Sequence, residues 1–318
     1  MRTSVLTKLN YATDFAIFFD FLVHKIPGFI GKSVQEITLK DLDNYIDSSV
    51  IEYFLRYLSY YTFHGKPCRN GEKAKARKLS SVRSLFKYFY NKDKLKENVA
   101  SKVSMPKLHE KAIIRLNNDE VDEVLETVES EDKFGSVFQD KYNLNARDRD
   151  IAILTLLLGT GIRVSELVGI NIDDLDLKNL AFKVTRKGGN VAVLYFSDEV
   201  KDAIENYLKW RTDRLKKAGL SEDTEALFIS LQNKRITVRA VENLVKKYTG
   251  LVNPLKSVSP HKLRSTFGTA LYRETKDIYM VAEVLGHRDV NTTKKHYAAL
   301  DEDIKREASN KVTLRKKS

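Results

Sequence analysis

Apolar residues recur at helical spacing through most of this chain, and that periodicity is what most constrains its fold. Two stretches illustrate the pattern: Ala12, Phe15, Phe19 and Leu22, and later Leu79, Val82, Phe86 and Phe89. Steps of three or four residues place such side chains on one face of a helix, with lysines and arginines opposite. We therefore predict a mainly α-helical protein.

One segment departs from the helical period. Residues 181–187 alternate between apolar and polar side chains, and residues 191–196 alternate again. Between them, Gly188 and Gly189 can adopt the positive φ that a hairpin turn requires. The sequence thus predicts a small antiparallel β-sheet in the C-terminal half.

A polar segment containing Pro106 divides the chain, whose 318 residues exceed one typical domain. Beyond it, Asn117 followed three residues later by Glu120 is a capping-box signal for a helix start. We expect four parts: a helical domain over residues 1–103, a linker over 104–112, a second domain over 113–300, and a tail over 301–318.

Positive charge is concentrated in the first domain. The net charge is +12, and thirteen basic residues lie between positions 66 and 107 against three acidic ones. Such a cluster favours a polyanionic partner, although a solvated helix face would have the same composition. The candidate DNA-binding residues are Lys73, Lys75, Arg77, Lys78 and Arg83.

Other features narrow the class of protein. The most apolar run, residues 151–158, is far shorter than a membrane span. Cys68 is the only cysteine, which excludes an internal disulfide and is typical of a reducing cytoplasm. Residues 173–176 lack the pattern of a calcium loop and should cap a turn, and residues 147–150 should form a charged helix start that is salt-bridged and solvated. We predict no metal site.

His261 and Arg264 are candidates for phosphate contact. Ser259 and Pro260 predict a helix start, which puts His261 and Arg264 one turn apart. An imidazole and a guanidinium there suit a phosphate, because the helix dipole and the arginine donors converge. The alternative is a solvent-facing pair without function.

Arg163 is a second candidate. It follows Gly159-Thr-Gly161, where an apolar helix should end and turn into another helix capped by Ser165. Glu166 is placed to hold the guanidinium. The alternative is a structural Arg–Glu pair that never contacts a substrate.

The last candidates are a lysine and a tyrosine. Lys187 stands at the tip of the predicted hairpin, with Arg186 as the alternative if the register differs by one residue. Tyr297 is the last residue of a pattern made of two motifs, Leu285-Gly286-His287 and Thr292-Thr-Lys-Lys-His-Tyr297. Phenol is a poor nucleophile at neutral pH, so a reactive tyrosine needs surrounding positive charge.

The order of these residues resembles the tyrosine site-specific recombinases, the phage integrases and Xer proteins. The resemblance implies a two-domain DNA clamp, in which a helical, SAM-like core-binding domain precedes the catalytic domain. It implies that Tyr297 forms a 3′-phosphotyrosine with DNA, without metal or ATP. Its catalytic residues would be Arg163, Lys187, His261, Arg264, His287 and Tyr297, with Glu166 in support.

The resemblance also implies partners. One partner is double-stranded DNA with inverted half-sites. The others are three further protomers, which form a homotetramer with this chain or include a related recombinase. The reaction would take place in the bacterial cytoplasm, at the nucleoid. The tail over 301–318 would dock on a neighbouring protomer. Two alternatives stay open: a topoisomerase of type IB, and a DNA-binding regulator without catalysis.

Overall fold

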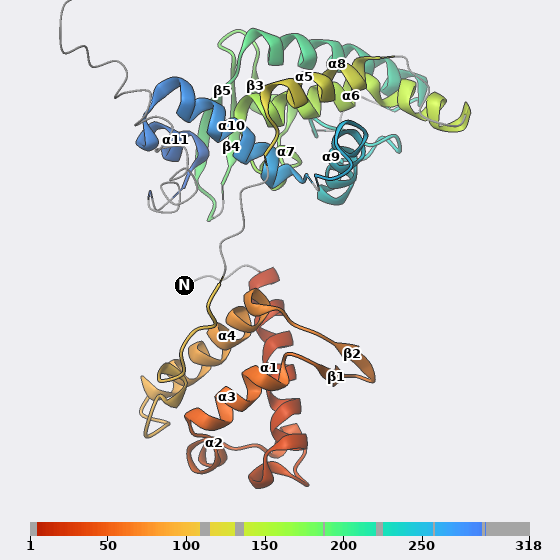
Figure 1. The fold of residues 1–318 in the computed structure, drawn as a ribbon. Coiled ribbons are helices and arrows are strands. Elements are labelled where there is room, and N and C mark those ends of the chain that lie inside the picture. The colour runs from red at the N-terminus through yellow and green to blue at the C-terminus, as the bar shows by residue number, and fades with distance from the viewer. Residues whose placement is uncertain are drawn as a thin grey trace, which may run out of the picture. The chain divides into compact units, whose positions relative to one another are not determined.

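A computed structural model describes residues 5–108, 115–130, 137–186, 188–220, 225–256, 258–287 and 290, with the side chains of residues 6 and 137–144 left out. The chain divides into two compact units, Met1–Lys111 and Ala112–Ser318, which we describe separately (Figure 1). Within the described ranges, no helix is long and apolar enough to cross a membrane.

Over its described residues, 5–108, the first unit is a bundle of four α-helices. They are α1 (Val5–Lys25), α2 (Leu39–Tyr45), α3 (Ser48–Tyr57) and α4 (Glu72–Tyr90). Short 3-10 turns at Pro27–Phe29 and Val34–Glu36 lie between α1 and α2, and a third, at Val99–Ser101, follows α4 and packs against it. Helices α1 and α4 pack together. Phe54 of α3 lies 5.0 Å from Phe18 and 5.2 Å from Phe21, centroid to centroid, in the core of this unit. The predicted stripe on α4 lies in this core, with Leu79, Val82 and Phe86 buried. The stripe predicted on α1 is only partly correct: Leu22 is buried, but Ala12 is exposed, and α1 turns its Ile17, Phe18 and Phe21 side chains to the core instead.

A short hairpin in this unit was not predicted from the sequence. Strands β1 (Tyr61–Phe63) and β2 (Lys66–Cys68) pair antiparallel, and His64 and Gly65 turn between them with positive φ. Three residues are too few to show alternation, so the sequence indicated only a break at Gly65 and Pro67.

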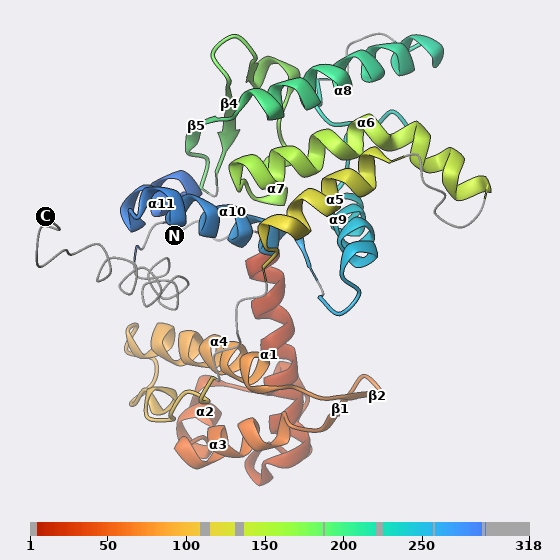
Figure 2. The ribbon, with the colours of Figure 1, turned by 45° about the horizontal axis from the view of Figure 1, so that its top comes forward.

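The second unit is built around one central helix. Its helices are α5 (Asn118–Glu129), α6 (Val137–Thr160), α7 (Val164–Leu167), α8 (Asp198–Lys217), α9 (Val238–Val252), α10 (Pro260–Thr275) and α11 (Ile278–Leu285). Helix α6 packs against α5, α8, α9 and α10 (Figure 2). Its apolar run is fully buried at Ile153, Leu154 and Leu157, which explains why that segment is apolar on all sides.

A three-stranded antiparallel sheet completes the second unit. Strands β4 (Ala181–Thr185) and β5 (Val191–Tyr195) form the predicted hairpin, with Lys183 opposite Val193. Strand β3 (Leu175–Asp176) adds to the other edge of β4 and was not expected, because it has only two residues. The predicted turn around residues 173–176 is present, and Asp176 accepts the Asn179 backbone N–H at 3.0 Å.

Two local predictions have opposite outcomes. The capping box is confirmed: Asn117 accepts the Glu120 N–H at 2.7 Å, and Glu120 accepts the Asn117 N–H at 2.9 Å. The residues predicted as a salt-bridged helix start, 147–150, do form ion pairs, but the start and its solvation are wrong, because α6 begins at Val137 and Arg149 and Asp150 are 5% and 3% exposed inside it. Their ion pair, at 2.7 Å, lies against the core, and four residues of sequence could not reveal which side α6 buries.

Candidate active site

Arg163 is positioned by the sharp reversal between α6 and α7. Gly161 has a φ of 60°, and a Cβ there would overlap the Phe267 ring, so glycine is required both for conformation and for space. The expectation that Ser165 caps the next helix is wrong. Arg163 itself is the N-cap of α7, because Glu166 supplies the carboxylate of the capping box.

Glu166 holds Arg163 through two hydrogen bonds. Its Oε1 accepts from Nη1 of Arg163 at 2.7 Å, and its Oε2 accepts from the Arg163 backbone N–H at 2.9 Å. The Glu166 side chain is 4% exposed, whereas that of Arg163 is 36% exposed. One edge of the guanidinium is therefore fixed inside the protein while another remains accessible. The remaining Nη2 donates to the Gly286 carbonyl at 3.2 Å.

Arg264 reaches the same place from α10. That helix begins at Pro260 with Ser259 as its N-cap, as the sequence predicted. Arg264 is buried, and its Nη1 donates to the Gly161 carbonyl at 2.6 Å while its Nη2 donates to the Leu285 carbonyl. Arg163 and Arg264 therefore bind adjacent carbonyls.

The carboxyl end of α11 explains how these cations can lie together. Gly286 is left-handed, so its N–H and that of His287 turn back to the Glu283 and Ala282 carbonyls, both at 2.9 Å. The next three carbonyls accept from guanidinium groups: Val284 from Arg186 at 2.9 Å, Leu285 from Arg264, and Gly286 from Arg163. The negative end of the helix dipole offsets the repulsion among the three cations.

The histidines flank this cluster in sequence. His287 directly follows Gly286 and is half-buried, while His261 is exposed in the first turn of α10. Lys187 and Tyr297 lie outside the described residues. Of the predicted catalytic set, the structure thus brings Arg163 and Arg264 together, with Glu166 behind them and His287 adjoining.

This cluster is suited to an oxyanion. Guanidinium groups present planar pairs of donors, which match the oxygens of a phosphate, and partial burial strengthens each charge-assisted bond. In the ranges that the structure covers, no group of three or more His, Cys, Asp or Glu could hold a metal ion. The guanidinium groups of Arg163 and Arg264 can stabilise negative charge on a phosphoryl group.

The five predicted DNA-binding residues all lie on α4 and divide into two groups. Lys73 is exposed; Lys75 pairs with Glu72 at 2.8 Å; and Arg77, 47% exposed, donates to the buried Asp14 at 2.6 Å. Lys73 and Arg77 therefore have accessible surface on one helix, whereas the Lys75 side chain is only 15% exposed.

Lys78 and Arg83 make contacts inside the first unit instead. Lys78 is 5% exposed, with its Nζ 3.7 Å from Asp14 Oδ1, and burial lowers its pKa. Arg83 donates to the carbonyls of Ala100, at 3.2 Å, and Val103. Their charges hold α4 against neighbouring segments, and the sequence could not distinguish them from surface cations.

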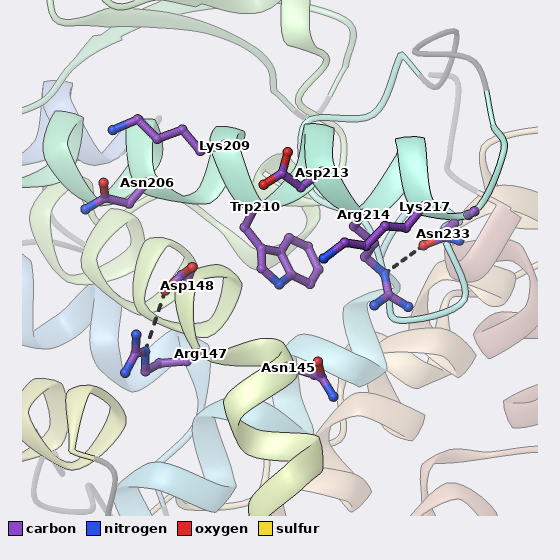
Figure 3. A pocket seen from close by; sticks show the side chains of 11 residues that line it. Asn145, Arg147, Asp148, Asn206, Lys209, Trp210, Asp213, Arg214, Lys217 and Asn233 are labelled. Atoms are coloured by element: carbon purple, nitrogen blue, oxygen red, sulfur yellow. Dashed lines mark hydrogen bonds and ion pairs between the residues drawn. The ribbon is translucent and has the colours of Figure 1, made fainter.

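A pocket elsewhere in the second unit contains none of the predicted site residues. It lies between α6 and α8, where Arg214 stands over the Trp210 ring at 5.4 Å and donates to Asn233 at 2.7 Å (Figure 3). Aspartates and lysines at its rim give it mixed charge. The described arginines that the sequence predicted, Arg163 and Arg264, therefore lie at the end of α11 and outside this pocket.

Comparison with known proteins identifies relatives of the whole chain. The family model described as the phage integrase family matches residues 115–303. Tyrosine recombinase XerC of Caldanaerobacter subterraneus is 36% identical over 310 residues, covering 96% of this chain and 80% of the relative. Tyrosine recombinase XerS of Streptococcus gordonii is 29% identical, covering 97% and 91%.

Solved structures share the fold. XerH recombinase bound to a palindromic difH substrate, in a post-cleavage complex, has a TM-score of 0.71 at 18% identity, covering 96% of this chain and 80% of that one. The Tn1549 transposon integrase in complex with transposon right end DNA has a TM-score of 0.65 at 18% identity, covering 96% and 95%.

Proposed function

Because this chain belongs to the phage integrase family of tyrosine recombinases, we propose that its second unit breaks and rejoins DNA strands at specific sites. The observation that carries the proposal is the convergence of Arg163 and Arg264 on the end of α11, with Glu166 holding the first of them. Two fixed guanidinium groups next to a histidine suit a scissile phosphate.

The two arginines stabilise the charge of the transition state. Arg163 and Arg264 bind the nonbridging oxygens, where negative charge builds as the nucleophile attacks. The Nη2 of Arg163 donates to the Gly286 carbonyl, and the Nη2 of Arg264 donates to the Leu285 carbonyl. Each of these donors can also bind a phosphate oxygen. Glu166 keeps the Arg163 guanidinium oriented during this exchange, so little reorganisation is needed.

The remaining roles complete the transfer. The Tyr297 oxygen attacks the phosphorus and passes its hydroxyl proton to the His261 imidazole, the bond to the 5′-oxygen breaks, and Lys187 gives that oxygen a proton, leaving a 3′-phosphotyrosyl bond and a 5′-hydroxyl. His261 assists proton transfer, and His287 hydrogen-bonds the phosphate. Attack by the 5′-hydroxyl of a partner strand reverses these steps. The number of phosphoester bonds is conserved, so no nucleotide is consumed.

The first unit supplies DNA binding. We assign residues 1–103 to a core-binding domain, 104–112 to a linker and 113–300 to the catalytic domain. Lys73 and Arg77 on α4 contact the phosphate backbone, since their side chains have accessible surface, and Lys75, with a side chain 15% exposed, adds its positive charge between them. Lys78 and Arg83 hold that helix in place.

Assembly follows the pattern of structural neighbours. One of them is a lambda integrase tetramer bound to a Holliday junction. We propose that four protomers of this chain, or two with a related recombinase, act on two duplexes with inverted half-sites. The tail over 301–318 docks between protomers, and the reaction takes place at the nucleoid in the bacterial cytoplasm.

Covalent trapping tests the proposal. A labelled half-site with a nick beside the scissile phosphate lets the short 5′-hydroxyl fragment diffuse away, so that the covalent adduct accumulates and migrates slowly in a denaturing gel. Tyr297→Phe should form no adduct while its affinity for DNA stays near that of the wild type. Tyr279→Phe is the matched control, because Tyr279 is 71% exposed on α11 and should react normally.

A covalent adduct formed by the Tyr297→Phe variant would show that Tyr297 is not the nucleophile. Recombinant product between two sites, as opposed to relaxed circles alone, separates the proposed recombinase from a topoisomerase. A protein that binds the half-site but never forms an adduct would be the DNA-binding regulator.

A further inference from the structure

Arg186 joins the β4–β5 hairpin to the carboxyl end of α11. Its Nη2 donates to the Val284 carbonyl at 2.9 Å, across 98 positions of sequence. Its Nε is buried and has no hydrogen-bond partner in the part of the chain that the structure describes. A buried donor without an acceptor loses its hydrogen bonds to water and gains none in return, so packing alone would favour an aliphatic side chain here. The guanidinium needs another explanation.

Close contact with Gly286 fixes where this guanidinium lies. A Cβ on Gly286 would overlap the Arg186 side chain, and the φ of 63° disfavours other residues there as well. Arg186 therefore packs directly on the backbone that leads into His287.

The backbone of Arg186 closes the hairpin turn. Its N–H donates to the Asn190 carbonyl at 2.8 Å, and its carbonyl accepts the Gly189 N–H at 3.0 Å. Gly188 and Gly189 both have positive φ, which allows so tight a turn. One residue thus holds the turn through its backbone and anchors it to α11 through its side chain.

We infer that Arg186 is a positioning residue for DNA cleavage, because it anchors the hairpin turn on the same run of carbonyls that binds Arg163 and Arg264. The inference rests on the proposed function, in which the next residue, Lys187, protonates the leaving oxygen. Adjacent Cα atoms are about 3.8 Å apart, so anchoring Arg186 restricts where that amine can reach. Arg186 does not act as the acid, because a guanidinium does not release its proton at neutral pH.

A bridging sulfur provides the test. Single-turnover cleavage is measured on a half-site whose scissile phosphate carries either the normal 5′-oxygen or sulfur, which leaves as a thiolate without a proton. Arg186→Ala should cleave the oxygen substrate roughly 10–100-fold more slowly, as misplacement by an ångström can cause, and should cleave the sulfur substrate near the wild-type rate. Arg186→Lys, which can still reach one carbonyl, should fall between.

Two further variants sharpen the result. Arg235→Ala is the matched control, since its Nη1 also donates to backbone carbonyls, Val168 at 2.9 Å and Ile170 at 3.1 Å, and it should cleave both substrates normally. Combining Arg186→Ala with Lys187→Ala should be no slower on the oxygen substrate than Lys187→Ala alone, because Arg186 acts through Lys187.

The outcomes distinguish failure of the role inferred for Arg186 from failure of the proposed function. A wild-type rate for Arg186→Ala, equal slowing on both substrates, or a double variant slowed by the product of the single effects would each overturn the role of Arg186. If Lys187→Ala is rescued by sulfur in the same experiment, the proposed function stands regardless. If the wild-type protein forms no covalent adduct, the proposed function fails, and the inference with it.

Discussion

Replacing Glu166 by alanine removes the carboxylate that fixes Arg163. Glu166 occupies the third position of α7, where it completes a capping box and binds the guanidinium. Glu120 occupies the third position of α5, completes a capping box there, and pairs with Lys256 at 2.6 Å. The two glutamates make similar bonds, and only Glu166 adjoins the arginine cluster. Glu120→Ala is therefore a matched control.

The expected loss of stability follows from the bonds removed. A hydrogen bond to a charged group contributes about 1.5–3 kcal/mol and a helix cap about 1 kcal/mol, so each alanine variant should lower the free energy of unfolding by about 2–4 kcal/mol. The effects on cleavage should differ. Arg163 without its carboxylate can leave its orientation, which should slow cleavage by roughly 10–100-fold, whereas Glu120→Ala should leave the rate unchanged.

Urea denaturation gives the free energy of unfolding, and single-turnover formation of the covalent adduct gives the cleavage rate, at a temperature where all variants are folded. Equal slowing by Glu120→Ala and Glu166→Ala would show that cleavage reports stability alone. A full rate in Glu166→Ala would show that Arg163 needs no support. Either result would refute the reasoning.

Three further predictions concern other parts of the chain. Hydrogen bonds from Lys32 and Thr38 hold the pKa of Asp41 at about 2, below its ordinary 3.8, so its stabilisation is complete above about pH 4 and lost as the pH falls toward 2; Asp41→Asn should flatten acid unfolding over that window, and an unchanged profile would contradict this. Replacing Lys73, Lys75 and Arg77 by glutamine should lower the slope of log affinity against log salt by about 0.9 for each phosphate that the variant no longer neutralises; an unchanged slope in filter-binding titrations would place the DNA elsewhere. Deleting residues 303–318 should preserve binding to one half-site and abolish cooperativity on two, and equal cooperativity in gel shifts would exclude docking by the tail.

Features that depend on neighbours within a few residues were predictable from the sequence. The apolar period predicted the helices around Phe18 and Phe86, and the capping box predicted the start of α5 at Asn118. Alternation around two glycines predicted β4 and β5. The order and spacing of the motifs also placed Arg163 and Arg264 in the pattern of one family, because each motif consists of a few consecutive residues that can be recognised without the fold.

Which groups meet and which are buried emerges only when distant segments pack together. Arg163 reaches Gly286 across 123 positions, and Arg186 reaches Val284 across 98. Neither contact leaves a local signal, because the acceptors are main-chain carbonyls that every residue possesses. Burial of Lys78 and Asp150 is likewise invisible in sequence. The apolar spacing of a helix and the hydrogen bonds of its caps involve residues within one or two helical turns, whereas a buried ion pair depends on which faces of distant helices pack together.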